Sequence, residues 1–266
     1  MLQLSIAVIH NYRFIAKEKN MIPYERRQQI LQLLDENEFV STEQIISKLE
    51  GVSESTIRRD LKAMSDEGLL LLMRGGASKV REDSQDTLIH SRMILNTDAK
   101  EKIARYASGL VREGEVIYLD AGSTPVRMVK YIRDKKIKIV TTNLLIFQEM
   151  TDARAECIVV GGEVLLATGS AVGALTVSTL EDMYFDRAFL GATGFSTQSG
   201  VSTPELQEAQ KKKVVRKNSR HTYILADSSK AGKVTMCKVF DLSEVTIICE
   251  KDLEILREFG NYYIAE

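Results

Sequence analysis

A chain of 266 residues is long enough for two domains that each bury a core, and 44% hydrophobic with 27% charged residues is typical of a folded globular protein. The net charge of −1 gives no overall attraction to nucleic acid, so a DNA-binding signal has to come from the local placement of charge. The three cysteines, Cys157, Cys237 and Cys249, and the three histidines lack metal-ligand spacing. We therefore expect reduced cytosolic thiols, no metal site and no cofactor.

The first twenty residues contain a short apolar run, residues 4–9, whose nearest basic residues follow it rather than precede it. This order and length match neither a secretory signal nor a membrane span. Because Met21 opens a clean helical pattern, we interpret residues 1–20 as a poorly ordered extension. The chain is expected to be cytoplasmic, with no membrane association.

Three short helices are expected after this extension. The first begins at Pro23, a residue suited to a first helical turn. Ser41 with Gln44 three residues later predicts a capped second helix, and Ser53 caps the third after a break at Gly51. Three helices with a tight turn between the second and the third are typical of a helix-turn-helix core.

The third helix combines an apolar face with a basic face. Ile57, Leu61 and Met64 fall on the apolar face, and an apolar run then leads to a basic glycine tip at residues 74–76, as in the wing of a winged helix-turn-helix protein. The start of a recognition helix approaches base edges, while longer basic side chains reach phosphates. The residues expected to contact DNA, from the first helix, the third helix and the wing, are Arg26, Arg27, Ser53, Ser55, Thr56, Arg58, Arg59, Lys62 and Arg74.

An ordinary solvated charged face is the alternative interpretation of the third helix. Residues 21–80 contain eight Lys or Arg residues against ten Asp or Glu residues, so this segment is not basic as a whole. The grouping of Arg58, Arg59 and Lys62 on one short helix beside a Gly-Gly wing favours DNA binding. A protein-interaction module is a weaker third possibility.

Beyond residue 100, strand-like apolar runs alternate with amphipathic segments such as residues 103–111 and 126–133. This alternation predicts an α/β domain with a mostly parallel sheet. We expect a winged helix-turn-helix domain at residues 21–78, with its turn and recognition helix at about 40–65, a linker at 79–99 with one helix near its end, and a second domain at 100–266. The expected strands are 116–119, 137–140, 157–160, 188–190, 222–225 and 245–249.

Polar residues follow several of these strands. Asp120, Gly122, Ser123 and Thr124 come after the first strand, and the backbone N–H groups of such a turn at a helix start suit a phosphate. A plain strand-to-helix turn capped by Thr124 explains this run equally well. Ligands bind at the carboxyl ends of parallel strands, so we expect the residues that follow these strands to share one ligand site. For Lys230, an exposed loop lysine remains a competing interpretation. The residues that follow other strands are Thr142, Asn143, Gly161, Gly162 and Lys230.

Both halves of the chain resemble the DeoR-type bacterial repressors. The N-terminal half has the arginine pair at 26–27, the V-S-x-x-T-I-R-R-D-L helix at 52–61 and a G-L-L-x-R-x-H-G-G-A wing in which Leu72 and Arg74 replace the arginine and the histidine. The C-terminal half has D-x-G-S-T at 120–124, T-N at 142–143, G-G at 161–162 and D-x-S-K at 227–230. A lysine before an I-A helix corresponds to Lys100.

The resemblance implies a sensor domain similar in fold to ribose-5-phosphate isomerase that binds a phosphorylated sugar, and it adds Gly173, Asp186 and Glu205 to the ligand site. It also implies a transcriptional repressor of a sugar or carbohydrate operon, which binds operator DNA as a homo-oligomer, a dimer or tetramer, formed through residues 100–266. The alternative is a sugar-phosphate isomerase fused to a helix-turn-helix module. Residues 186–189 read D-R-A-F and lack the second aspartate of the isomerase loop, so we expect no enzymatic activity.

Overall fold

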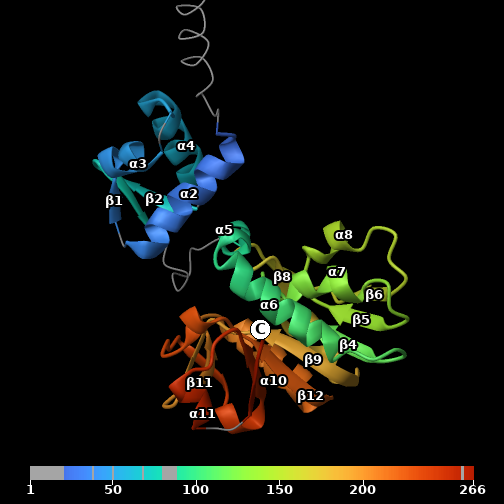
Figure 1. Cartoon of the computed structure of the whole chain (residues 1–266). Coiled ribbons are helices and arrows are strands. Elements are labelled where there is room, and N and C mark those ends of the chain that lie inside the picture. Colours follow the sequence, from blue (N-terminus) through green and yellow to red (C-terminus); the bar gives the residue numbers. More distant parts are fainter. Residues whose placement is uncertain (1–20, 38, 50, 68, 80–88, 259–260) are drawn as a thin grey trace, which may run out of the picture. The chain divides into compact units, whose positions relative to one another are not determined.

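The computed structural model describes residues 21–37, 39–49, 51–67, 69–79, 89–258 and 261–266 (Figure 1). The chain divides into two compact units, Met1–Arg81 and Glu82–Glu266, here called the N-terminal unit and the C-terminal unit. The extension expected at residues 1–20 lies outside the described residues.

The N-terminal unit contains three helices and a small antiparallel sheet. The helices are α2 (Pro23–Glu36), α3 (Thr42–Lys48) and α4 (Glu54–Asp66). The sheet has the order β1 (Phe39–Ser41), β3 (Gly76–Lys79) and β2 (Leu70–Met73), so the hairpin β2–β3 forms the wing. The apolar faces of the helices meet in a core that includes Ile30, Leu34, Ile45, Ile57, Leu61 and Met64.

Short-range capping explains where two of these helices begin. Ser41 accepts a hydrogen bond from the backbone N–H of Gln44, and the Gln44 side chain accepts one from the backbone N–H of Ser41. Ser53 caps α4 by accepting from the backbone N–H of Thr56. These contacts satisfy N–H groups that a helix leaves unpaired at its start. The predicted starts of both helices agree with the structure, whereas the three-residue strand β1 was not predicted.

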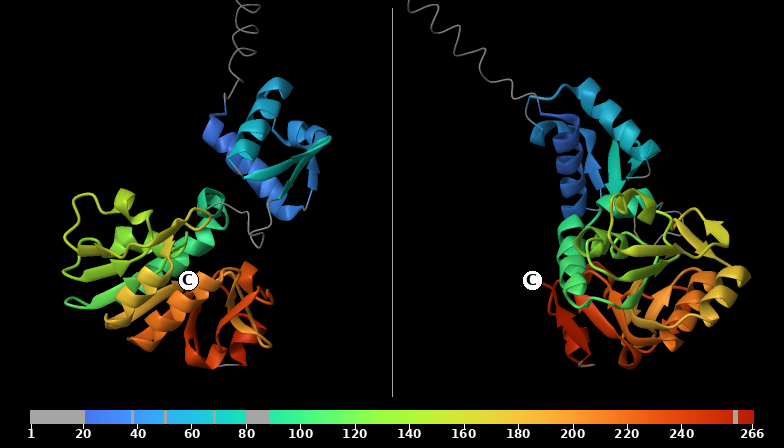
Figure 2. Two further views of the ribbon diagram at one scale, coloured as in Figure 1. Left: turned by 180° about the vertical axis from the view of Figure 1, so that it is seen from behind. Right: turned by 90° about the vertical axis from the view of Figure 1, so that its right-hand side faces the viewer.

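A seven-stranded parallel sheet forms the centre of the C-terminal unit (Figures 1 and 2). All six neighbouring pairs of strands are parallel. The strands in spatial order are β15 (Tyr262–Ile264), β14 (Thr246–Cys249), β12 (Ser219–Leu225), β9 (Phe185–Gly191), β4 (Val116–Leu119), β5 (Lys138–Thr141) and β6 (Glu156–Val159).

Helices cover both faces of this sheet, and successive strand residues point to opposite faces. Ile117 and Leu119 pack in a cluster with Ile103 of α6 (Thr97–Gly109) and Val129 of α7 (Val129–Ile132). Tyr118 lies in the cluster on the other face, with residues of α9 (Ala174–Glu181) and α10 (Leu206–Lys217). The predicted α/β class with a mostly parallel sheet is confirmed.

Two small antiparallel sheets and several short helices complete this unit. One sheet has the order β10 (Gly194–Ser196), β11 (Gly200–Thr203) and β13 (Cys237–Phe240), and the other pairs β7 (Glu163–Leu165) with β8 (Ser170–Val172). The short helices are α5 (Ile89–Ile94), η1 (Pro125–Met128), α8 (Ile146–Glu149), η2 (Ser228–Lys230), η3 (Leu242–Glu244) and α11 (Glu254–Arg257). In the described part of the chain, no helix has the length and apolar character needed to cross a membrane.

The six predicted strands all overlap strands of the central sheet, with ends shifted by a few residues. The seventh strand, β15, and the small sheets were not predicted, because they are three or four residues long and carry no sustained apolar pattern. The segment expected to be a linker, residues 79–99, contains α5 and the start of α6. Its residues 80–88 lie outside the described residues.

Candidate functional site

The exposed face of α4 carries the residues expected to contact DNA. Arg58, Arg59 and Lys62 are all exposed, while Ile57 and Leu61 on the opposite face are fully buried. Arg58 forms an ion pair of 2.7 Å with Glu54 one turn earlier, and both side chains are more than half exposed. Such an exposed pair contributes little stability, so the Arg58 guanidinium can exchange it for a phosphate or a base at low cost.

Three hydroxyl groups gather at the start of α4. The Ser53 hydroxyl lies 3.0 Å from that of Ser55 and 2.8 Å from that of Thr56. In the wing, Arg74 is exposed at the turn between β2 and β3. The strand before it exposes Leu71, Leu72 and Met73 instead of basic side chains, so Arg74 is the basic residue at the tip of the hairpin.

The two arginines of α2 have intramolecular partners, and the largely buried partner of Arg26 argues against its expected role as a phosphate contact. Arg26 forms an ion pair of 2.6 Å with Asp60 of α4, and each side chain is only 12% exposed. The Arg26 guanidinium also donates to the carbonyl of Met21 at 2.6 Å. Arg27 pairs with Glu67 at 3.0 Å on the surface. Arg26 therefore links α2 to α4 inside the unit.

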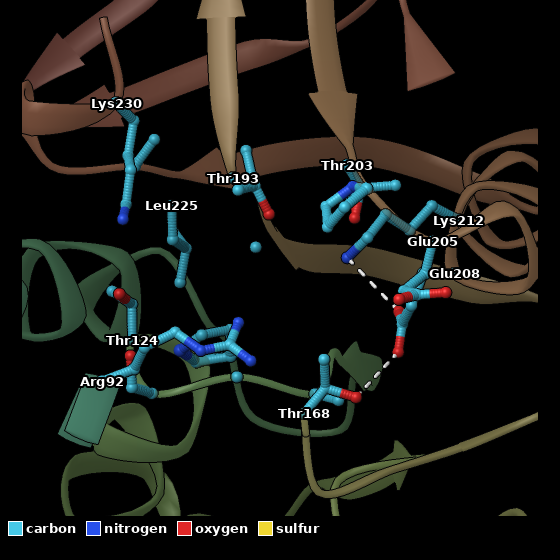
Figure 3. A pocket seen from close by; sticks show the side chains of 18 of the residues that line it. Arg92, Thr124, Thr168, Thr193, Thr203, Glu205, Glu208, Lys212, Leu225 and Lys230 are labelled. Carbon is cyan, nitrogen blue, oxygen red and sulfur yellow. Dashed lines mark hydrogen bonds and ion pairs between the residues drawn. The ribbon is translucent and has the colours of Figure 1, made fainter. Parts of the chain in front are cut away.

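A polar pocket opens at the carboxyl ends of the strands of the central sheet (Figure 3). Its walls come from the loop after β4, from residues after β9, from the start of α10 and from the loop after β12. Five residues of the predicted ligand site line it, namely Gly122, Ser123, Thr124, Glu205 and Lys230. This is the edge at which open α/β sheets place ligands.

The loop at residues 122–124 presents backbone donors to this pocket. Among the hydrogen bonds of the described residues, none uses the backbone N–H of Gly122, Ser123 or Thr124. Gly122 has a φ of 134°, a conformation that side-chain-bearing residues rarely adopt. The Thr124 side chain makes no cap hydrogen bond, which removes the interpretation of Thr124 as a mere N-cap. Pro125 opens a 3-10 turn followed by four α-helical residues, so the donors come from the loop rather than from a long helix.

Three basic side chains, Arg92, Lys100 and Lys230, join the loop in the wall of the pocket. Lys100 is 2% exposed and donates from Nζ to the carbonyl of Arg92 at 2.7 Å. Burial lowers the pKa of Lys100 to about 8, against the opposing effect of the Asp227 carboxylate. Arg92 lies in α5 and donates to the carbonyl of Ala167 at 2.6 Å. Lys230 is 7% exposed, which is inconsistent with an exposed loop lysine.

A network of buried charges forms part of the opposite wall, through Glu208 and Lys212, and extends behind it. Asp120, fully buried, pairs with Lys212 and lies 3.7 Å from Lys211, and it accepts from the backbone N–H of Gly191 at 3.0 Å. Glu208 pairs with Lys211 at 2.9 Å and lies 3.9 Å from Lys212. Burial opposes ionisation of Glu208, but the two lysines outweigh it and hold the pKa of that carboxyl well below its usual range. Asp120 thus orients the pocket wall and does not line it.

Two further predicted ligand residues support the loop from behind. Asn143 is fully buried and donates from Nδ2 to the carbonyls of Asp120 and Gly122, each at 3.3 Å. The Thr142 hydroxyl, also buried, accepts from Lys211 Nζ at 3.1 Å and bonds the Tyr118 hydroxyl at 2.9 Å. The structure places both residues next to the site but outside the lining of the pocket.

Four predicted ligand residues lie elsewhere, which corrects their assignment. Gly161, Gly162 and Gly173 surround the hairpin β7–β8, where a Cβ at Gly162 would clash with the side chain of Thr176. Asp186 lies at the amino end of β9, where it accepts from the backbone N–H of Val116 at 3.0 Å. The carboxyl end of β9, which borders the pocket, is about 16 Å away at 3.3 Å per residue.

The site contains residues that sequence reasoning did not assign. These side chains come from α5, the β7–β8 turn, the end of β9, β11 and α10, and they are Arg92, Thr168, Thr193, Thr203, Glu208 and Lys212. Only α10 carried a usable signal, because its buried face holds charged residues where apolar ones are normal. In the described residues, no group of His, Cys, Asp and Glu is suited to hold a metal ion.

Comparisons with known proteins agree on both units. The model of the DeoR C terminal sensor domain matches residues 95–251, and that of the DeoR-like helix-turn-helix domain matches residues 26–83. The HTH-type transcriptional regulator FruR of Bacillus subtilis is 32% identical over 91% of this chain and 96% of its own length. The glycerol-3-phosphate regulon repressor of Escherichia coli is 29% identical over 84% of this chain and 89% of its own.

Among solved structures, ribose 5-phosphate isomerase A from Methanocaldococcus jannaschii is similar to 51% of this chain over 55% of its own length, with 21% identity and a TM-score of 0.38.

Proposed function

The chain belongs to the DeoR family of transcriptional regulators, and we propose that it represses a sugar or carbohydrate operon under the control of a phosphorylated sugar. In this proposal the N-terminal unit binds operator DNA and the pocket of the C-terminal unit binds the effector. A helix-turn-helix protein that reads two half-sites works as a dimer, so we include self-association of the cytoplasmic protein in the proposal.

The observation that carries the effector proposal is the loop at residues 122–124. It brings three backbone N–H groups without a partner among the described residues to the same pocket as Arg92, Lys100 and Lys230. Backbone donors together with cations are the usual means of holding a phosphate, because the charge-assisted hydrogen bonds are short and strong. The Thr124 hydroxyl adds a donor for the phosphate, and the hydroxyls of Thr193 and Thr203 add partners for a sugar.

For DNA we propose a contact surface smaller than the sequence suggested. Arg58, Arg59 and Lys62 supply base and phosphate contacts, with the Ser53, Ser55 and Thr56 hydroxyls near the backbone and Arg74 at the wing. Arg26 is assigned a structural role, because its guanidinium is committed to Asp60.

A path for control begins at α5, the first described helix of the C-terminal unit after residues 80–88. Within the described part of the chain, it is held by hydrogen bonds from Arg92 to Ala167, from Lys100 to Arg92 and from Arg127 to Met93. A ligand shifts the equilibrium between two arrangements only if it binds one of them better. An anion that recruits Arg92 and Lys100 competes with two of these bonds, so the arrangement of α5 differs between free and bound protein.

A regulatory role is favoured over an isomerase. Relatives that match 91% and 84% of this chain are named as a transcriptional regulator and a regulon repressor. Asp186, the acidic residue expected from the isomerase loop, lies at the amino end of β9, away from the pocket at the carboxyl end, and pairs with Arg220 at 3.0 Å. We therefore propose that the pocket binds its sugar phosphate without turnover.

A two-step experiment tests the proposal. Phosphorylated sugars are first screened for stabilisation of the purified full-length protein against heat, since a ligand that binds only the folded state raises the melting temperature. Binding to the protein's own promoter DNA is then measured with and without each hit. We expect at least one sugar phosphate to stabilise the protein and to change its DNA affinity. Sustained isomerisation of a hit would overturn the proposal in favour of an enzyme.

A further inference from the structure

The pocket has two ends of different chemistry. Figure 3 shows Arg92, Thr124 and Lys230 on one side of the cavity and Thr203, Glu205 and Glu208 on the other, with Thr193 between them. The two sets line opposite sides of the cavity, so they face different parts of a ligand that fills it.

The first end brings together basic side chains that suit one phosphate group. Arg92, Lys100 and Lys230 carry three positive charges, and Asp227 is the acidic residue of the lining at this end. Asp227 interacts with Lys100 and is further engaged by the Ser229 N–H at 3.1 Å. A group of basic side chains suits the charge of a phosphate monoester at neutral pH, which is between about −1.5 and −2.

The second end has an uncompensated carboxylate. The charges of Asp120 and Glu208 are balanced by those of Lys211 and Lys212, all within one buried network. Glu205 is half-buried in the lining and forms no ion pair with any residue of the described chain. It occupies the N-cap position of α10 without making a cap hydrogen bond, so its oxygens remain available to a ligand.

We infer that this pocket selects phosphate monoesters of neutral polyhydroxy compounds, with the phosphate at the Arg92–Lys230 end and hydroxyl groups donating to Glu205. The inference rests on the proposed function and deepens it. A carboxylate accepts hydrogen bonds only, so it favours hydroxyl donors at the far end of the ligand. A second phosphate or a carboxylate at that end faces an uncompensated like charge in a partly enclosed site, so Glu205 rejects bisphosphates and phosphorylated sugar acids.

Matched ligand pairs test this selectivity. The pairs are glycerol 3-phosphate with 3-phosphoglycerate, sorbitol 6-phosphate with 6-phosphogluconate, and fructose 6-phosphate with fructose 1,6-bisphosphate. Affinities are measured by titration calorimetry on the full-length protein. In at least one pair we expect the member with one anionic group to bind more tightly by about tenfold or more, since like charges across an interface are strongly unfavourable.

The variant Glu205→Gln separates charge rejection from any loss of folding. It keeps the shape of the side chain and one acceptor oxygen but removes the charge, so we expect the member with two anionic groups to gain affinity and the member with a neutral tail to lose some. The selectivity ratio then falls toward one. The control Glu181→Gln removes the same charge from an exposed site at the end of α9 and should behave as the native protein does.

The inference is overturned if the native protein binds both members of each pair equally, or if E205Q leaves the ratio unchanged. These results would leave the sugar-phosphate effector itself in place. Failure of every phosphorylated probe to bind would instead overturn the proposed function, and the selectivity with it.

Discussion

Lys100 of α6 donates a hydrogen bond from Nζ to the backbone carbonyl of Arg92 in α5, over 2.7 Å. Both residues line the effector pocket, and both supply positive charge to the end proposed for the phosphate. A ligand that engages the Lys100 ammonium therefore also affects how α5 is held. We therefore expect Lys100 to influence the affinity for the effector, the pH dependence of that affinity and the control of DNA binding.

The affinity for a phosphorylated effector should fall as the pH rises from 7 to 9. The pKa of Lys100, lowered by burial to about 8, means that the ammonium of the free protein is lost within this range, while a phosphate monoester keeps its second charge. The protonated form binds the anion better, so binding is strongest below pH 8 and is accompanied by proton uptake. Calorimetry in buffers of different ionisation enthalpy measures this uptake.

The variant Lys100→Met should bind more weakly and with a flatter pH dependence. Lys102→Met, which removes an exposed lysine of the same helix, serves as the control and should keep the native profile. An unchanged slope of affinity against pH in K100M would show that another group titrates.

The stability of the protein should depend on pH in the opposite direction to its affinity for the effector. The folded pKa lies below the usual value of about 10.4, so without ligand the contribution of Lys100 to stability rises between about pH 8 and pH 10.

Removing the Thr124 hydroxyl should weaken effector binding without affecting DNA binding by the free protein. A hydrogen bond to a charged group contributes about 1.5–3 kcal/mol, which corresponds to a loss of roughly tenfold to a hundredfold in affinity for Thr124→Ala. Lys230→Ala should act in the same direction. Thr151→Ala, at an exposed position outside the pocket, is the control. Normal release of DNA by the effector in both pocket variants would exclude this phosphate site.

Replacing Arg58 and Arg59 with alanine should abolish specific DNA binding. Removing one interaction with a base or a phosphate costs about 1–3 kcal/mol, and fewer phosphate interactions also reduce the dependence of affinity on salt. Because both side chains are exposed, the fold should remain intact. Promoter binding is measured across a salt series, with Arg112→Ala in the C-terminal unit as an exposed control. Native affinity in the double variant would contradict the proposed reading helix.

Arg26 and Arg27 are neighbours, yet their replacement should have different effects. Arg26→Ala leaves Asp60 largely buried without its partner, a change that we expect to cost about 3 kcal/mol. Arg27→Ala removes a surface pair with Glu67 and should cost less than about 1 kcal/mol. Amide hydrogen exchange in α2 and α4 reports the stability of this unit separately. Equal exchange in the two variants would refute a structural role for Arg26.

The helices of the N-terminal unit could be predicted because their signals are local. Ser41 and Gln44 are three residues apart, as are Ser53 and Thr56, so the caps are visible in any short window of sequence. The alternation of strands and helices beyond residue 100 is likewise visible in short windows of sequence. The partner of Arg26 is 34 residues away, and nothing in the sequence indicates that Asp60 would take up its charge.

Only part of the pocket could be predicted from the sequence, because several of its residues are far apart in the chain. The loop at residues 122–124 is contiguous and carries its own signature, whereas Arg92, Thr168 and Lys212 come from separate elements that only the sheet order brings together. The expected position of Asp186 in the ligand site was wrong, because a residue reaches that site only from the carboxyl end of a strand. It lies near the start of β9, and ligands gather where parallel strands end.

The corner between α5 and α6 turns at Asn96, which has a left-handed φ of 51° that asparagine tolerates better than most residues. Its side-chain amide donates to Asp227 and to Ser229, each over 3.2 Å, and so fastens this corner to the short helix that ends at Lys230. These hydrogen bonds join two segments that are more than a hundred residues apart in the chain, and we expect the two segments to move together. An effector that draws Lys230 inward would carry the corner with it, so substitution of Asn96 is a route to a regulator that binds its signal but no longer responds.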